Sequence, residues 1–335
     1  MDRYQRDIAR GLDAAFAAAE VVDLDGASAR LIVFSDHHRG ARDGADDFRR
    51  CEPAYAAALG YYLEAGHRLC VLGDSEELWE CAPAEVLGAH RPTLELEAAF
   101  HAAGRYERFW GNHDDRWRYE DEVTAHLGPL FGSLSVREAL RVRITGAAGA
   151  SGGELFLAHG HQGTLGSDRW SWLSRLFVRH LWRPLQRRLD LPSTTPSRDW
   201  DLRERHDTAM FTWARAHAAR PVLIAGHTHR PVFWTSRPPA PATAAVGGSP
   251  PLRRAAREYA RAEARRVARA AHPVDPPCYF NTGCCSFGDV TGIEIADGAI
   301  RLVRWPADDG RPTPKVLASA GLGDVFAAVA AYPGS

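Results

Sequence analysis

Five short apolar runs, each ending in a polar turn, constrain this 335-residue chain more than any other feature. Such runs are typical of buried strands in an α/β domain, where ligand sites gather beyond the carboxyl ends of the strands. Glycine stands beside most of the turns and lets the backbone bend sharply close to a ligand. Side chains from turns far apart in the sequence can therefore converge on one site. The runs occupy residues 30–35, 69–72, 106–110, 154–158 and 221–225.

Helices and a hairpin are predicted around these runs. Residues 2–20 carry apolar side chains at helical spacing, and residues 51–65 are also expected to form a helix. Residues 279–283 resemble a further strand. Asp297-Gly298 favours a hairpin between the two apolar runs that flank it.

Two segments interrupt this pattern. Residues 163–215 combine tryptophan, leucine and many arginines, so we expect a helical insertion that caps the domain. Residues 236–275 begin as a Pro/Ala-rich loop and continue as a basic stretch, which is typical of a solvated helix face. The length of the chain allows one large α/β domain with insertions or two small domains.

Composition excludes several classes of protein. Hydrophobic residues make up 45% and charged residues 25% of the chain, which argues against disorder of the whole chain. The net charge of -1 argues against a nucleic-acid binder. Six cysteines without a CxxC pair indicate reduced thiols. The sequence has no apolar stretch long enough to span a bilayer, and acidic residues interrupt the N-terminal run, so a cytoplasmic location is expected.

The polar turns have the chemistry of a binuclear metal site. Two divalent ions held close together need carboxylates and imidazoles, with one carboxylate able to bridge. Asp36 and His38 are two residues apart and can point to one side of an extended segment, and His227 and His229 repeat that spacing. Asp74 is the natural bridging carboxylate, and the ligand mixture suits Mn, Fe or Zn better than Ca. The candidate metal ligands are Asp36, His38, Asp74, Asn112, His159, His227 and His229.

The ordered motifs resemble those of the calcineurin-like metallophosphoesterase superfamily. Each motif alone is a weak signal, but all five occur in order and each stands at a strand end. The resemblance covers about residues 30–230 and implies a four-layer αββα sandwich, with residues 1–335 as a single domain, residues 163–215 as a helical cap and residues 236–275 as a second insertion. The motifs are Asp36-x-His38, Gly73-Asp74-x-x-Glu77, Gly111-Asn112-His113-Asp114, His159 and Gly226-His227-x-His229.

The resemblance also implies the cofactors and the roles of the residues. The expected cofactors are two divalent metal ions, with Mn²⁺ first and Fe or Zn as alternatives. A hydroxide between the ions would attack phosphorus, and His113 would protonate the leaving oxygen or stabilise its charge. Glu77 would orient His113, and Asp114 would support the site. One ion would be held by Asp36, His38, Asp74 and His229, and the other by Asp74, Asn112, His159 and His227.

One departure from the superfamily concerns the phosphate-binding arginine. Many of its phosphatases carry Asp and then Arg after the metal carboxylate, with the arginine on the phosphate. This chain has Glu77 and Leu78 at those positions. The arginine must therefore come from elsewhere, and Arg39 and Arg116 are the candidates.

A second departure concerns the substrate. Glu77 and Trp79 make the chain similar to the bacterial UDP-2,3-diacylglucosamine pyrophosphohydrolase group, which also has a helical insertion before the final His-x-His. That group typically has arginine after the asparagine, where this chain has His113 in a GNHD motif. The difference favours a broader phosphomonoesterase or phosphodiesterase.

Several alternatives remain open at this stage. Residues 163–215 could form an apolar lid for an acyl chain or a membrane surface, with arginines for anionic headgroups. The chain would then be a pyrophosphohydrolase of a lipid-linked nucleotide or sugar phosphate, peripheral to the inner membrane. A non-catalytic metal-binding scaffold and a nuclease are further alternatives. His37 and His161, which lie beside candidate ligands, are expected to be supporting or surface residues.

Overall fold

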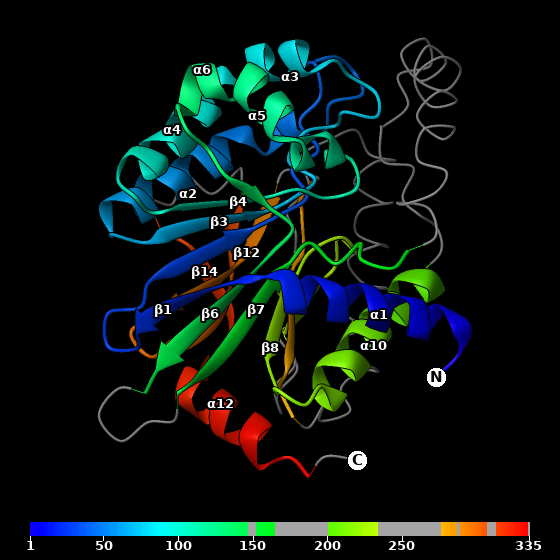
Figure 1. The fold of residues 1–335 in the computed structure, drawn as a ribbon. Helices are drawn as coiled ribbons and strands as arrows, with labels where there is room; N and C mark the ends of the chain where they lie inside the picture. The colour runs from blue at the N-terminus through cyan, green and yellow to red at the C-terminus, as the bar shows by residue number, and fades with distance from the viewer. Residues whose placement is uncertain (147–151, 165–199, 234–275, 287–288, 307–312, 334–335) are drawn as a thin grey trace, which may run out of the picture.

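The computed structural model describes six stretches of the chain. Over these residues the chain is a mixed α/β protein built on two mixed β-sheets, with helices on the outer side of each sheet (Figure 1). The two sheets pack face to face, so the architecture is compatible with an α/β sandwich. The described stretches are residues 1–146, 152–164, 200–233, 276–286, 289–306 and 313–333.

The smaller sheet contains β7 and β8, the two strands that end in the polar turns of the second half of the chain. In spatial order its six strands are β1 (Glu20–Asp25), β6 (Ala139–Thr145), β7 (Gly153–Ala158), β8 (Val222–Ala225), β10 (Tyr279–Thr282) and β9 (Pro231–Phe233). β7, β8 and β10 run parallel to one another, and β6 and β9 run antiparallel to their neighbours β7 and β10. The parallel core of this sheet places the ends of β7 and β8 at one edge.

The larger sheet contains the strands formed by the first three apolar runs, at residues 30–35, 69–72 and 106–110. Its eight strands include β14 (Lys315–Gly321), β13 (Ala299–Pro306), β12 (Asp289–Ala296), β2 (Leu31–Phe34), β3 (Arg68–Leu72), β4 (Tyr106–Phe109) and β5 (Val136–Arg137) in spatial order, with β11 (Cys285–Ser286) paired to β12. β2 to β5 are parallel, and β12 is antiparallel to β2. The Asp297-Gly298 hairpin turn between β12 and β13 is confirmed, with φ of 53° and 71° at its two residues.

Helices cover both outer sides of the sandwich (Figure 1). The larger sheet is covered by α2 (Glu52–Glu64), α3 (Pro83–Ala89), α4 (Arg91–Ala102), α5 (Glu120–His126) and α6 (Gly128–Phe131). α1 (Arg3–Ala18) and α10 (Trp200–Ala216) lie side by side over the smaller sheet, and α12 (Leu322–Ala331) packs against β7, β13 and β14. Short 3₁₀ turns, η1 (Phe48–Arg50) and η2 (Asp115–Arg118), precede α2 and α5.

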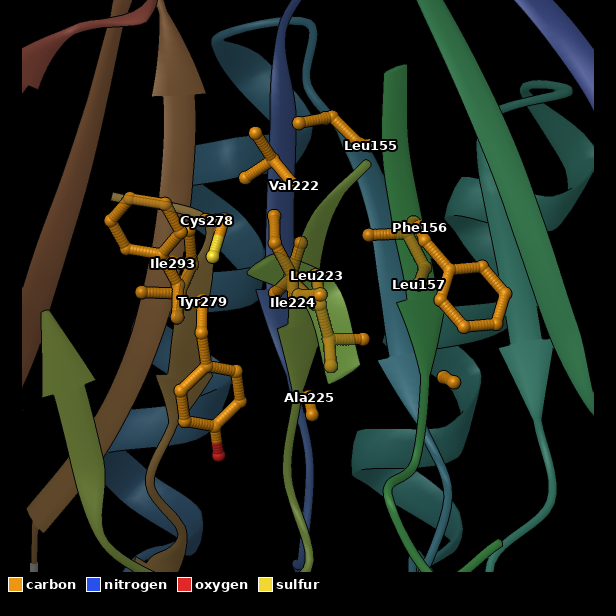
Figure 2. Close-up of a cluster of buried hydrophobic side chains, with 14 of the residues drawn as sticks. Leu155, Phe156, Leu157, Val222, Leu223, Ile224, Ala225, Cys278, Tyr279 and Ile293 are labelled. Carbon is orange, nitrogen blue, oxygen red and sulfur yellow. The ribbon is translucent and has the colours of Figure 1, made fainter. Parts of the chain in front are cut away.

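Alternating side chains of β2 divide the hydrophobic core into two layers. Leu31 and Val33 belong to the cluster between the sheets, whereas Ile32 and Phe34 belong to the cluster beneath the helices. Figure 2 shows the first cluster, in which side chains of β7, β8 and β10 meet Ile293 from the larger sheet. Both faces of β2 are therefore buried, which explains its unbroken apolar sequence.

The N-terminal helix follows its prediction closely. α1 begins after Asp2, whose side chain accepts from the Gln5 amide in a capping box. Ile8, Leu12 and Phe16 form its buried stripe. The strands β1, β6 and β14 had no counterpart among the predicted elements. β1 and β14 are edge strands in which no side chain is fully buried, so the hydrophobic pattern gives little sign of them.

The predicted insertions have different outcomes. Residues 200–215, expected to belong to a cap, form most of α10, and its Ala209, Met210 and Trp213 are buried in the core against the smaller sheet. The helix expected for these residues is present, and its apolar side chains pack on the host domain. The assignment of residues 163–215 as a cap stays a prediction. Residues 165–199 and all of residues 236–275 lie outside the described residues.

Two predictions from composition can also be compared with the structure. All six cysteines lie in described stretches and none forms a disulfide; five are buried and Cys284 is half-buried. Among the described helices, none is both long enough and apolar enough to cross a membrane.

Candidate metal centre

The polar turns of both sheets meet at one edge of the sandwich. Parallel neighbours bring their carboxyl ends together, so the turns after β2, β3 and β4 face those after β7 and β8. Backbone hydrogen bonds join the turns within each half: the Asp36 amide donates to the Gly73 carbonyl at 3.2 Å, and the Gly226 amide donates to the His159 carbonyl at 2.9 Å. These turns carry all seven candidate ligands, namely Asp36, His38, Asp74, Asn112, His159, His227 and His229.

Five of these residues have a left-handed backbone, which non-glycine residues rarely adopt. Each such residue costs about 1–3 kcal/mol and persists only where the surroundings impose it, most often at functional sites. The strain is therefore concentrated in the turns that present the side chains. The residues are Asp36, His38, Asp74, His227 and His229, with φ of 54°, 47°, 48°, 67° and 56°.

Two glycines make room for the carboxylates. A Cβ on Gly111 would lie 2.2 Å from Asp74 Oδ1, and a Cβ on Gly226 would lie 2.4 Å from Asp36 Oδ2. Both contacts are too short for any side chain. The glycines of the GNHD and GHTH motifs are thus needed because a carboxylate from another turn occupies the space.

The first group of converging atoms consists of Asp36, His38 and His229, whose ligand atoms all lie within 4.8 Å of one another. His229 Nε2 is 3.2 Å from Asp36 Oδ1, and His38 Nε2 is 3.8 Å from the same oxygen. The two imidazole nitrogens, His38 Nε2 and His229 Nε2, are 3.0 Å apart. Asp36 is fixed by the His227 amide, which donates to its Oδ2 at 2.9 Å.

The second group consists of Asp74, His159 and His227, within the same 4.8 Å limit. His159 Nε2 is 3.2 Å from Asp74 Oδ2. Asp74 Oδ2 also lies 3.8 Å from His38 Nε2 of the first group, so this carboxylate touches both groups. Asn112 is 9% exposed, and its buried Oδ1 has no hydrogen-bond partner among the described residues.

The hydrogen bonds of the histidines indicate that a cation belongs between them. His159 Nδ1 donates to the Leu72 carbonyl at 2.7 Å, so in the neutral ring the Nε2 lone pair faces the Asp74 carboxylate. His38 Nδ1 lies 3.1 Å from Glu77 Oε2, so its Nε2 lone pair likewise faces His229. Electron pairs held this close require a proton or a metal ion between them. Buried His, Asp and Glu side chains that could hold a metal ion are therefore present, and they fit that role.

The charged side chains of the two groups shift one another's pKa. Burial alone would raise the pKa of Asp36 and Asp74, but the surrounding histidines hold both pKa values well below the usual range. Burial alone would lower the pKa of His159, but the carboxylates of Asp74 and Asp36 raise it to about 9. Burial lowers the pKa of His227 well below its usual value. The metal-free centre thus holds protons that a cation would displace.

His113 stands beside His38 of the first group, at 4.6 Å between ring centroids, with a fixed orientation. Its Nδ1 lies 2.8 Å from Glu77 Oε2, its amide donates to Asp74 Oδ1 at 2.8 Å, and its ring stacks on Trp79 at 4.1 Å between centroids. Trp79 Nε1 donates to the Asn112 carbonyl at 2.7 Å. Burial opposes protonation of His113, but Glu77 and Asp74 raise its pKa. The expected orientation of His113 by Glu77 is present in the structure.

Glu77 could also be counted with His38 and His113 as a third metal-binding group. Its oxygens lie within hydrogen-bonding distance of Nδ1 of both rings, at 3.1 Å from His38 and 2.8 Å from His113. A carboxylate that accepts from two imidazoles leaves their Nε2 atoms free to face the centre. We therefore describe Glu77 as the residue that orients both histidines.

Asp114 supports the turns and does not face the centre. It is fully buried and accepts from the amides of Gly111 at 2.6 Å, Asp74 at 3.2 Å and Ser75 at 2.8 Å. Burial and the carboxylates of Asp74 and Glu76 raise its pKa to about 7. Asp114 is thus a positioning residue that ties the turn after β3 to the turn after β4.

A buried cluster of four charges lies behind the first-half turns. Arg39 donates to Glu76 Oε1 at 3.2 Å and also pairs with Glu97. Arg108 donates to Glu97 Oε2 at 3.2 Å and pairs with Glu76 at 2.5 Å. All four side chains are fully buried. The proposed phosphate contact by Arg39 is therefore wrong, because its guanidinium is enclosed and already paired.

Arg116, the other candidate for phosphate binding, is also engaged. Its Nε and Nη2 donate to the two oxygens of Glu122 at 2.6 and 2.8 Å. Arg203 of α10 is half-buried, and its charge acts on the ligand histidine His229. Burial lowers the pKa of His229, and the charge of Arg203 contributes to that shift.

The two neighbouring histidines are both buried, so neither is a surface residue. His37 packs edge-on between Phe48 and Tyr55, behind the turn that carries Asp36. His161 is 3% exposed and lies 4.8 Å from the Trp110 ring between centroids, and its Nδ1 has no partner among the described residues. Burial lowers the pKa of His161 to about 3, so it is neutral.

Sequence reasoning missed two residues on α10 that contact the ligand turns. His206 and Asp207 are buried, and they bind the turns after β7 and β8 respectively. They lie in a segment predicted to be a cap, so nothing in the motif spacing pointed to them. Comparison with known proteins found no family model that matches the chain and no match among curated proteins.

Proposed function

We propose that this chain is a binuclear metal-dependent phosphoesterase of the calcineurin-like metallophosphoesterase superfamily. One observation carries the proposal: Asp74 touches two groups of His and Asp ligands, and it also accepts from the backbone amide of His113, whose ring is oriented by Glu77. A shared carboxylate between two ligand groups is what a pair of close divalent ions requires. The two face-to-face sheets with outer helices are compatible with the αββα sandwich of that superfamily.

The proposed site would hold two ions through two sets of residues. Asp36, His38 and His229 with Asp74 would hold one ion, and His159, His227 and Asn112 with Asp74 would hold the other. Bound divalent ions would lower the pKa of water and polarise phosphoryl oxygens. The mixture of imidazole and carboxylate favours Mn, Fe or Zn.

The residues of the chain would supply the remaining chemistry. Glu77 accepts from Nδ1 of His113, which leaves Nε2 as the nitrogen able to give a proton to a leaving oxygen. Burial opposes protonation of His113, but the carboxylates of Glu77 and Asp74 outweigh it and raise the pKa of the ring, which favours the protonated form. Trp79 holds the ring in place by stacking on it. Arg203 of α10, whose charge acts on His229, is a candidate that we propose for the negative charge of the substrate.

The experiment is a substrate panel with the Mn²⁺-loaded protein and two variants. Phosphomonoesters, diesters, pyrophosphates, lipid-linked pyrophosphates and DNA would be compared, and cleavage of one class identifies the substrate. His113→Gln should lower kcat by about 10²–10⁴ on that substrate while Mn²⁺ binding is retained, because general acid catalysis contributes that range. His126→Gln, at a half-exposed histidine paired with Glu122, is the matched control and should leave kcat unchanged. Metal binding without cleavage of any substrate would instead support a scaffold.

A further inference from the structure

Helix α10 contacts the turn that carries His159 through a buried histidine. His206 Nε2 donates to the Gly160 carbonyl at 2.7 Å. Its Nδ1 is 2.8 Å from the Tyr4 hydroxyl of α1 and must accept from it, since Nε2 carries the proton. Burial lowers the pKa of His206 to about 4, so the ring is neutral and its tautomer is fixed.

The next residue of α10 contacts the other turn of the second half. Asp207 Oδ1 accepts from the Thr228 hydroxyl at 3.0 Å and from the Tyr279 hydroxyl at 2.7 Å. Asp207 Oδ2 lies 2.5 Å from Arg230 Nη2. Thr228 stands between His227 and His229, and Arg230 follows them, so Asp207 holds the segment that presents both histidines.

The packing around Gly160 leaves little room for movement between the helix and the turns. Gly160 has a φ of 108°, and a Cβ built on it would lie 3.2 Å from Met210 Sδ of α10 and 3.4 Å from the Cβ of His227. The His206 and His227 rings are 5.0 Å apart between centroids. Because closely packed interiors transmit displacement, a shift of α10 would move the ligand histidines.

We propose that His206 and Asp207 are positioning residues that hold the His159 turn and the His227–His229 turn in ligand geometry and so set the affinity of the centre for divalent ions. This inference rests on the proposed metal centre but not on the reaction. Residues that orient metal ligands typically change metal affinity by about 10- to 100-fold when mutated. Neither residue touches the ions or the substrate in this account.

The test compares Mn²⁺ affinity in two variants at position 206, of which only one has a side-chain amide long enough to reach the Gly160 carbonyl. The amide nitrogen of His206→Gln stands near the position of Nε2 and can donate to the Gly160 carbonyl. The amide of His206→Asn stands near Nδ1 and cannot reach it. Titration of the metal-free full chain with Mn²⁺ should show near wild-type affinity for His206→Gln and affinity about 10-fold or more weaker for His206→Asn.

A control on the same helix separates positioning from loss of stability. Trp213 Nε1 donates to Asp13 Oδ1 of α1 at 2.7 Å, two turns further along α10 from the centre. Trp213→Phe removes that bond and should lower the melting temperature without changing Mn²⁺ affinity. Equal affinity for His206→Gln and His206→Asn would overturn the inference, as would weakened Mn²⁺ binding by Trp213→Phe. Failure of the wild-type chain to bind Mn²⁺ would overturn the metal centre itself.

Discussion

The two halves of the candidate metal centre are anchored in different ways. The turns after β2 and β3 are held largely by neighbours of the ligands themselves: Arg39 follows His38, and Glu76 lies two residues beyond Asp74. The turns after β7 and β8 are held from α10 and β10, by residues such as His206 and Asn281. The first half is therefore anchored mainly by buried charges near its motifs, and the second by side chains remote from its motifs.

The two halves of the centre are therefore stabilised by different kinds of interaction. Buried Arg–Glu pairs are stable only with both partners present, so the first half depends on charge balance. The second half depends on the hydrogen bonds that His206 and Asp207 of α10 make to its two turns. Three predictions test this contrast between the two halves.

The largest effect is expected from the buried charge cluster of the first half. Glu97→Gln would leave Arg39 and Arg108 with one carboxylate, Glu76, in a fully buried setting. Breaking a buried pair by removing one partner costs about 3–5 kcal/mol. We therefore expect the free energy of unfolding, measured in urea, to fall by about that amount.

A surface carboxylate on the same helix gives the control for this prediction. Glu95 of α4 pairs with Arg91 in an exposed i,i+4 contact. Glu95→Gln should change the free energy of unfolding by less than about 0.5 kcal/mol. Equal small losses for Glu95→Gln and Glu97→Gln would show that charge balance does not hold the first half.

The second prediction concerns pH and the protons of the metal-free centre. The pKa of His159 is raised to about 9, so below that pH a proton occupies the ring and must leave when an ion binds. Mn²⁺ affinity should thus rise by about tenfold per pH unit for each displaced proton up to pH 9 and then level off. Titration calorimetry at several pH values measures this slope, and an affinity independent of pH from 7 to 9 would contradict it.

The smallest effect separates two arginines. Arg203→Ala should raise KM by about tenfold with kcat little changed, since a hydrogen bond to a charged group contributes about 1.5–3 kcal/mol. Arg116→Ala should leave KM unchanged, because the Arg116 guanidinium is already paired with Glu122. Steady-state kinetics on the substrate found by the panel compares them. A larger increase in KM for Arg116→Ala than for Arg203→Ala would instead indicate that Arg116 binds the phosphate.

Much of the candidate site could be predicted from the sequence because its residues lie at the ends of apolar strands. Asp74 and His159 are 85 positions apart, but each stands within two residues of the end of an apolar strand, β3 at Leu72 and β7 at Ala158. Strand ends and the GNHD and GHTH patterns are local signals. The position of such residues at one sheet edge follows from topology alone.

The remaining features depend on tertiary packing. Arg39 looks available for substrate when it is seen beside His38 in the sequence, and only the fold shows Glu97 enclosing it. His206 and Asp207 stand in no motif, and the arginines and tryptophans before them suggested a cap. β1 was missed because its edge position leaves most of its side chains partly exposed.

The central claim is that side chains from turns of both sheets meet around a pair of ions that share Asp74. The most direct measurement is the Mn²⁺ content of the purified chain after equilibrium dialysis, for the wild type and for Asp74→Asn. We expect close to two ions per wild-type chain and a loss of binding in the variant, because Asp74 contacts both ligand groups. A wild-type chain that binds no ion, or an Asp74→Asn chain that binds as many ions as the wild type, would contradict the account.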